Sequence, residues 1–90
     1  MKGEGIFQRQ GEISMKNLLH QIVDGKTVFE PEDGQIIEFQ KTVHALRHAY
    51  QRGYIGFFKA HRESKTGNHY YEKVVINNVT NAGKYFLNAH

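Results

Sequence analysis

Residues 39–60, FQKTVHALRHAYQRGYIGFFKA, carry the clearest structural pattern in the chain. Five apolar or aromatic residues recur at spacings of four, three, four and four, which places them in one helical stripe: Phe39, Val43, Leu46, Tyr50 and Tyr54. Gly53 supplies a helix stop, and the β-branched and aromatic run from Ile55 to Ala60 is typical of a strand. The stretch predicts a helix over residues 40–53 followed directly by a strand.

The side of this helix opposite the apolar stripe is polar and basic. At about 100° per residue, four residues point away from the stripe, and two more lie beside them. The four are Lys41, Ala45, His48 and Arg52, and the flanking pair is His44 and Gln51. This side of the helix is the first candidate for a binding surface.

A hairpin and a final helix are expected after this stretch. Residues 70–76, YYEKVVI, form a second strand-like run, and the intervening HRESKTGNH, residues 61–69, has turn chemistry and a basic character. Thr80 is a candidate N-cap for a last helix whose apolar face would hold Ala82, Tyr85, Phe86 and Ala89.

Before the central helix, the pattern predicts one helix and one short strand. Ser14 is a candidate N-cap for a helix over residues 14–24, which buries Leu18, Leu19, Ile22 and Val23 and ends at Gly25. Residues 26–29 suit a short edge strand, because Pro31 follows directly. Residues 31–38 fit a short helix or a strand arm, and the short helix is favoured. Residues 1–13 are expected to form an arm and residues 14–90 one domain.

The composition restricts the class of protein. Ninety residues leave room for one domain, and the absence of cysteine excludes disulfides, a thiolate zinc site and a cysteine nucleophile. No apolar run approaches the roughly 20 residues that span a membrane, so a cytoplasmic protein without a membrane partner is expected. Residues 1–39 carry four basic and seven acidic residues, a net −3, whereas residues 40–90 carry eight and two, a net +6. The basic half predicts a polyanion-binding surface or attraction between two copies.

Two segments of the chain resemble the winged helix-turn-helix superfamily. VHALRHAYQRGYI is similar to a recognition helix that runs into the first wing strand, and VTNAGKYFL is similar to the closing helix of small bacterial and phage winged-helix proteins. The resemblance covers residues 39–87. It implies an α+β fold with three to four helices and a hairpin wing in the C-terminal half, which also favours the short helix at residues 31–38.

This resemblance implies double-stranded DNA binding by a homodimeric transcription regulator or accessory factor. The helix would contact the major groove through Lys41, His44, Ala45, His48 and Arg52, since such side chains can meet base acceptors or a thymine methyl. The wing would contact DNA through Arg62, Lys65 and Asn68. The N-terminal arm and the last helix, with Tyr85, Phe86 and Leu87, are the expected dimer surface. An ordinary solvated helix face would carry similar residues.

Two other classes of function stay open at this point. The acidic segment at residues 30–33 and the basic half would also suit a protein-interaction module, including one that binds an acidic protein partner. His44 and His48 have the i, i+4 spacing of metal ligands, but no glutamate sits between them as a base, and no phosphate loop or nucleophile elbow is present. The sequence therefore predicts no enzymatic activity, no cofactor and no bound metal.

Overall fold

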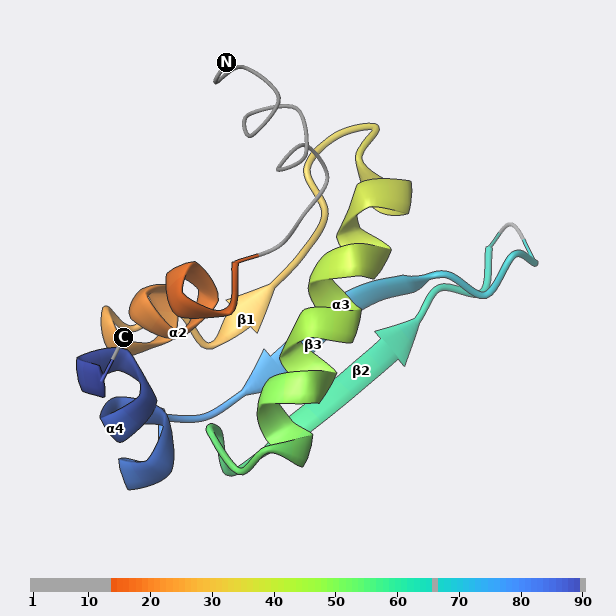
Figure 1. Ribbon diagram of the computed structural model, residues 1–90. Coiled ribbons are helices and arrows are strands. Elements are labelled where there is room, and N and C mark those ends of the chain that lie inside the picture. The colour runs from red at the N-terminus through yellow and green to blue at the C-terminus, as the bar shows by residue number, and fades with distance from the viewer. Residues whose placement is uncertain (1–13, 66, 90) are drawn as a thin grey trace, which may run out of the picture.

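The computed structural model describes residues 14–65 and 67–89 (Figure 1). The predicted N-terminal arm at residues 1–13 lies outside them. The described chain is an α+β domain with three helices and one three-stranded antiparallel sheet. The elements are α2 (Met15–Val23), β1 (Val28–Phe29), α3 (Ile36–Gln51), β2 (Phe58–Arg62), β3 (Tyr71–Ile76) and α4 (Asn81–Ala89). Within the same residues, no helix is both long and apolar enough to cross a membrane.

The sheet has the strand order β1-β3-β2, so the predicted short edge strand is confirmed. Strand β3 is central, and its Val74 pairs with Phe29 of β1 on one side and with Ala60 of β2 on the other. Helix α3 lies across β2 and β3, and α2 contacts both α3 and α4 (Figure 1). The largest fully buried side chains come from α2, α3, β3 and the segment between α3 and β2: Leu19, Ile22, Val43, Leu46, Ile55 and Val74. One core therefore joins the sheet to its helices.

Helix α2 begins where its capping residue predicts. The Ser14 hydroxyl accepts a hydrogen bond from the Asn17 backbone N–H at 3.2 Å, which satisfies one free donor of the first turn. Leu18, Leu19 and Ile22 are buried as predicted. Val23 is not, because at the end of the helix it is 52% exposed.

The short helix predicted for residues 31–38 does not form. Residues 32–35 make a turn in which the Gln35 N–H donates to the Glu32 carbonyl at 2.8 Å, and Gly34 has a φ of +73°. A residue in this left-handed region interrupts a right-handed helix. Helix α3 then begins at Ile36, four residues earlier than predicted, so residues 36–38 belong to its first turn. No separate helix precedes α3 between β1 and Ile36, which removes the expected helix-turn-helix pair.

Along α3, the predicted stripe is confirmed for its first three members and wrong for Tyr50, while Tyr54 packs against the core from beyond the helix. Phe39, Val43 and Leu46 are buried, but Tyr50 is 46% exposed and Ala49 takes the buried place beside it. Tyr50 instead stacks at the edge of the sheet on Phe58, with ring centroids 6.1 Å apart.

The predicted stop at Gly53 is confirmed. The Gly53 N–H donates to the Tyr50 carbonyl at 3.0 Å, and Gly53 adopts a φ of +79°. This left-handed residue after the last turn is a common helix ending. Tyr54 consequently lies beyond α3 and stacks on Phe86 of α4, with ring centroids 4.8 Å apart.

The predicted hairpin is confirmed, although β2 continues through two residues assigned to its tip. His61 pairs with Lys73, and Arg62 pairs with Tyr71, so Glu72 is an extra residue on β3. Such a bulge changes the face on which the following side chain lies. Beyond it, Glu63 is buried and its carboxylate accepts a hydrogen bond from the Lys65 N–H at 2.9 Å.

Helix α4 begins after Thr80 as predicted, since the Gly83 N–H donates to the Thr80 hydroxyl at 3.2 Å. Its predicted apolar face is largely wrong: Ala82 and Ala89 are exposed and Tyr85 is 75% exposed. The helix packs through Gly83, with Phe86 and Leu87 half-buried against the core. A glycine makes this possible, because a Cβ at residue 83 would lie 2.5 Å from the Tyr54 carbonyl oxygen.

Candidate nucleic-acid interface

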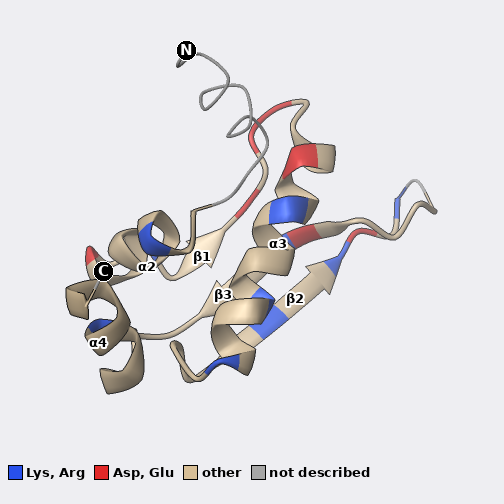
Figure 2. Cartoon of the chain, viewed as in Figure 1, with Lys and Arg blue, Asp and Glu red and all other residues tan. Residues whose placement is uncertain are grey.

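The side of α3 that faces away from the core carries four of the predicted DNA-contacting residues. Lys41, His44, His48 and Arg52 are all exposed. No aspartate or glutamate occurs between Lys41 and Arg52, so this side of the helix is uniformly basic or neutral. We call these four residues the α3 basic face. Figure 2 shows Lys and Arg on α3 and β2, and Asp and Glu on the loop before α3 and its first turn.

Ala45, the fifth residue predicted on this helix face, is less exposed than the other four. It is half-buried and packs against the core. Ala45 is one turn from both the exposed Lys41 and the fully buried Ala49, so it lies at the border between the exposed and the buried sides of the helix. Ala45 therefore contributes to packing, and it is not counted among the four exposed residues of the α3 basic face.

The three residues predicted on the wing occupy two different environments. Lys65 and Asn68 are exposed at the hairpin tip. Arg62 is at the end of β2, where its Nη1 donates to the His69 carbonyl at 2.8 Å and its Nη2 donates to the Tyr71 hydroxyl at 2.8 Å. Its guanidinium is held in place beside the sheet, whereas Lys65 and Asn68 lie farther along the hairpin.

A second arginine, which the sequence analysis did not select, converges on the same tyrosine. Arg47 of α3 donates from Nη2 to the Tyr71 hydroxyl at 2.9 Å. Its Cζ is 5.6 Å from the Tyr71 ring centroid and 5.7 Å from that of Phe58, while the Cζ of Arg62 is 4.3 Å from the Tyr71 ring. Across the described ranges, neither arginine forms an ion pair with a carboxylate. We call Arg47, Arg62 and Tyr71 the arginine–tyrosine cluster.

The two arginines lower the pKa of Tyr71. The largest cause is the hydrogen bond from Arg47, which stabilises the phenolate, and the positive charges of Arg47 and Arg62 act in the same direction. Partial burial of the phenol opposes them by disfavouring its charged form. The net effect of the two guanidinium groups on the phenol is thus to favour its phenolate form.

Gln40 fixes the backbone of Tyr71 against α3. Its Nε2 donates to the Tyr71 carbonyl at 2.8 Å, and its Oε1 accepts from the Tyr71 N–H at 2.9 Å. The same amide nitrogen also donates to the Ile36 carbonyl within α3 at 2.8 Å. One side chain thus satisfies both backbone groups of a strand residue. Gln40 and Arg47 are seven residues apart, which places them on one side of the helix. This spacing is the sequence signal that could have shown that both bind the same strand residue.

The two histidines with metal-ligand spacing lie on α3. His44 and His48 are both exposed on α3. Within residues 14–65 and 67–89, no group of three or more histidine, aspartate or glutamate residues could hold a metal ion.

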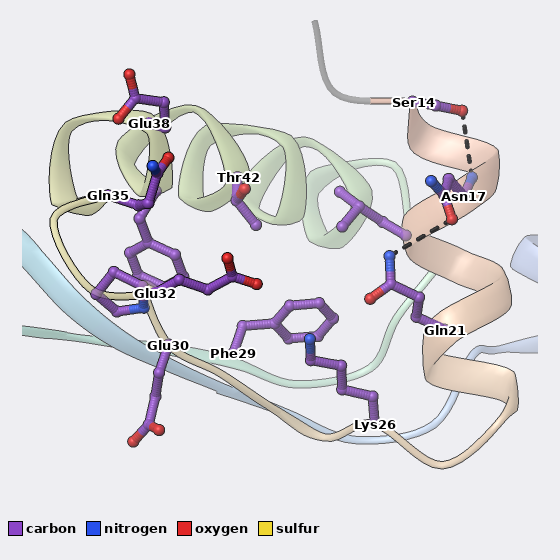
Figure 3. A pocket seen from close by; sticks show the side chains of 13 residues that line it. Ser14, Asn17, Gln21, Lys26, Phe29, Glu30, Glu32, Gln35, Glu38 and Thr42 are labelled. Carbon is purple, nitrogen blue, oxygen red and sulfur yellow. Dashed lines mark hydrogen bonds between the residues drawn. The ribbon is translucent and has the colours of Figure 1, made fainter. Parts of the chain in front are cut away.

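A groove of about 300 Å³ lies between the first half of α2, the loop after β1 and the start of α3 (Figure 3). Its lining includes the buried side chains Leu18, Phe29 and Phe39. The Lys26 ammonium lies 4.6 Å above the Phe29 ring.

The acidic residues around this groove point in different directions. The Glu32 carboxylate points into the groove, whereas those of Glu30 and Glu38 point away from it (Figure 3). The groove therefore combines a few buried apolar side chains with a mostly polar lining, one inward carboxylate and one inward ammonium. Its charge differs from that of the α3 basic face.

Comparisons with known proteins found no matching family model, no matching curated protein and no matching solved structure. The features that bear on function are therefore the α3 basic face with the neighbouring hairpin and the groove between α2 and α3.

Proposed function

We propose that this protein binds double-stranded DNA through the α3 basic face and the β2–β3 hairpin, as a winged-helix-type regulator or accessory factor of transcription without enzymatic activity. The observation that carries the proposal is the α3 basic face itself: four exposed basic or titratable side chains on a sixteen-residue helix, with no carboxylate among them. A helix fits the major groove, where such side chains reach phosphates and base edges.

The hairpin adds a second set of contacts next to α3. It projects away from the helices (Figure 1) and carries Lys65 and Asn68 exposed at its tip. Arg62 and Arg47 lie where the hairpin meets α3, since both bind Tyr71. In this proposal, α3 is held against the sheet by Gln40 and Tyr71 rather than by a preceding helix.

The salt dependence of binding by a double variant tests this assignment. Lys41→Ala with Arg52→Ala removes two exposed cations from the α3 basic face. Each phosphate contact contributes about 0.9 to the slope of log affinity against log salt, so the slope should fall by about two if both residues contact phosphates. Fluorescence anisotropy with a labelled duplex between about 50 and 200 mM salt measures it.

The matched control removes the same charge from elsewhere on the surface. Lys26→Ala with Lys84→Ala changes two exposed lysines, one beside the groove of Figure 3 and one on α4. The slope of log affinity against log salt for this control should stay within about 0.5 of the wild-type slope. If the slope fell equally in both double variants, net charge alone would account for the binding. Absence of duplex binding at low salt would overturn the proposal.

We further propose that the working form is a homodimer, because one copy offers few cationic contacts and two copies would double them. The predicted dimer surface needs revision, since Phe86 and Leu87 pack against the core of their own chain. Val23 and Leu87 line a shallow hollow between α2 and α4, and Tyr85 is the most exposed large side chain of α4. Multi-angle light scattering of wild type and Tyr85→Glu tests whether this end of the domain pairs.

The groove between α2 and α3 favours a second candidate function, a protein-interaction module. Its three buried apolar side chains, Leu18, Phe29 and Phe39, and the inward Glu32 carboxylate suit a peptide with apolar and basic side chains. Peptides of this composition that bind at about 200 mM salt, and bind more weakly to Glu32→Gln, would support it, since apolar contacts resist salt better than phosphate contacts.

A further inference from the structure

We propose that the arginine–tyrosine cluster is a binding site for a single phosphate group at the junction of α3 and the hairpin. In the proposed function this group is a backbone phosphate of DNA, and to that extent the inference rests on it. The same chemistry would recognise a free phosphate ion, and the experiment below separates the two sources.

The first argument is the convergence of two positive charges. Both Nη2 atoms are within 2.9 Å of one hydroxyl oxygen, which places them less than about 6 Å apart. Like charges at this separation repel, and no carboxylate within the described residues pairs with either guanidinium. A bound anion would remove this repulsion.

The second argument is the supply of unused hydrogen-bond donors. A tyrosine hydroxyl has one donor and two acceptor positions, so accepting from Arg47 and Arg62 leaves its O–H free to donate. Each guanidinium carries five N–H donors, and hydrogen bonds to other described residues use one of them in Arg47 and two in Arg62. Donors from three side chains are therefore available around one point.

The arrangement suits phosphate better than carboxylate. A carboxylate is planar, and a single guanidinium satisfies it in a bidentate pair. The tetrahedral phosphate group offers acceptor oxygens in several directions, which matches donors contributed by α3, β2 and β3. The neighbouring α3 basic face also belongs to a surface that suits a polyanion.

The third argument is that the cluster is rigid before a ligand arrives. Gln40 binds both backbone groups of Tyr71, and the rings of Phe58 and Tyr71 support the Arg47 guanidinium. The bulge at Glu72 places Tyr71 opposite Arg62. A site that is held in this way loses less conformational entropy when it binds. Phosphate bound here would also join the hairpin to α3.

The test uses Tyr71→Phe, which removes the hydroxyl and keeps the ring, with Tyr70→Phe as its neighbouring control. Inorganic phosphate, compared with chloride at equal ionic strength, should raise the thermal midpoint of wild type and Tyr70→Phe but not of Tyr71→Phe. A labelled duplex should bind Tyr71→Phe about tenfold more weakly, since a hydrogen bond to a charged group is lost, and Tyr70→Phe unchanged.

A second measurement needs no variant and keeps the inference testable if Tyr71→Phe does not fold. Tyrosinate absorbance of the wild-type protein follows the phenol titrations with and without inorganic phosphate. A phosphate bound at the cluster should move the titration of the most acidic tyrosine to higher pH, because its negative charge opposes formation of the phenolate. An unchanged titration contradicts a site at Tyr71.

The outcomes separate the inference from the proposed function. A phosphate effect without duplex binding supports the site, assigns it to a free phosphate and overturns the DNA proposal. Duplex binding that Tyr71→Phe leaves intact, with no effect of inorganic phosphate, overturns the site and keeps the DNA proposal. Absence of both kinds of binding overturns both.

Discussion

Replacing Gly83 by alanine is expected to destabilise the domain, although alanine is normally the better helix residue. Gly83 is buried in α4 where the helix crosses the segment after α3. An added Cβ would lie 2.5 Å from both the Tyr54 carbonyl oxygen and a Val79 methyl group. Carbon atoms in ordinary contact are about 3.5–4.0 Å apart, so α4 would have to move by roughly 1 Å.

The magnitude follows from the contacts that this movement strains. Overpacking a buried position costs about 1–3 kcal/mol. The shift also disturbs the Tyr54–Phe86 stack and the hydrogen bond from the Thr80 N–H to the Tyr54 carbonyl, 2.8 Å long, which add about 1 kcal/mol each. The higher helix propensity of alanine returns about 1 kcal/mol. The net loss is about 2 kcal/mol or more in the free energy of unfolding.

Urea unfolding followed by far-ultraviolet circular dichroism measures this loss directly. At about 4–8 °C per kcal/mol for a domain of this size, the melting temperature should fall by about 8–16 °C. Lys84→Ala on the same helix is the matched control, because Lys84 is exposed and its replacement should change stability by less than about 0.5 kcal/mol. A Gly83→Ala protein as stable as wild type, or more stable, would refute the close packing of α4 on Tyr54.

Three further changes test other parts of the structure. Leu46→Ala should reduce the free energy of unfolding by about 2–5 kcal/mol in urea titrations, because Leu46 is fully buried, whereas the exposed His48→Ala should be nearly neutral. Thr80→Val should cost about 1–2 kcal/mol by thermal melting, since the hydroxyl caps α4 and also donates to the Gly53 carbonyl. Tyr71 has a lowered pKa in the folded protein, so above that pKa the unfolded chain binds more protons than the folded one. Wild type should therefore gain stability relative to Tyr71→Phe as the pH rises toward about 10. It should lose this advantage as the pH falls through the pKa of the folded protein. A difference that is constant with pH in urea titrations would contradict the hydrogen bond from Arg47.

The sequence predicts the ends of elements well where one residue carries the signal. Ser14 caps α2, Gly53 ends α3 and Thr80 caps α4, as their side chains or backbone freedom predict. These signals are local, because a cap or a left-handed glycine acts on backbone groups within four residues of itself. The two strands of the hairpin are found for a similar reason, since turn residues separate two runs of strand-forming residues.

Packing partners explain where the same reasoning fails. Ala49 and Tyr50 are consecutive residues near the end of α3, and their packing against the sheet decides which of the two is buried. Tyr50 reaches the rim and stacks on Phe58, while the small Ala49 fits under the helix. At the start of α3, the pair Ile36 and Ile37 is too short for its period to separate helix from strand. The left-handed turn at Gly34 separates these residues from β1, and the helix begins at Ile36.

The arginine–tyrosine cluster shows why a candidate site at a junction is harder to predict than a helix face. The α3 basic face follows from the helical period alone, and its four exposed members were predicted. The cluster joins residues from three elements, and it depends on the one-residue bulge that sets Tyr71 opposite Arg62. Because side chains alternate along a strand, one residue more or fewer would turn the phenol to the other face of the sheet. The sequence predicts Arg62 only as a wing contact, because no local pattern shows the β2–β3 register that sets Tyr71 opposite it or the hydrogen bond from Arg47 to Tyr71.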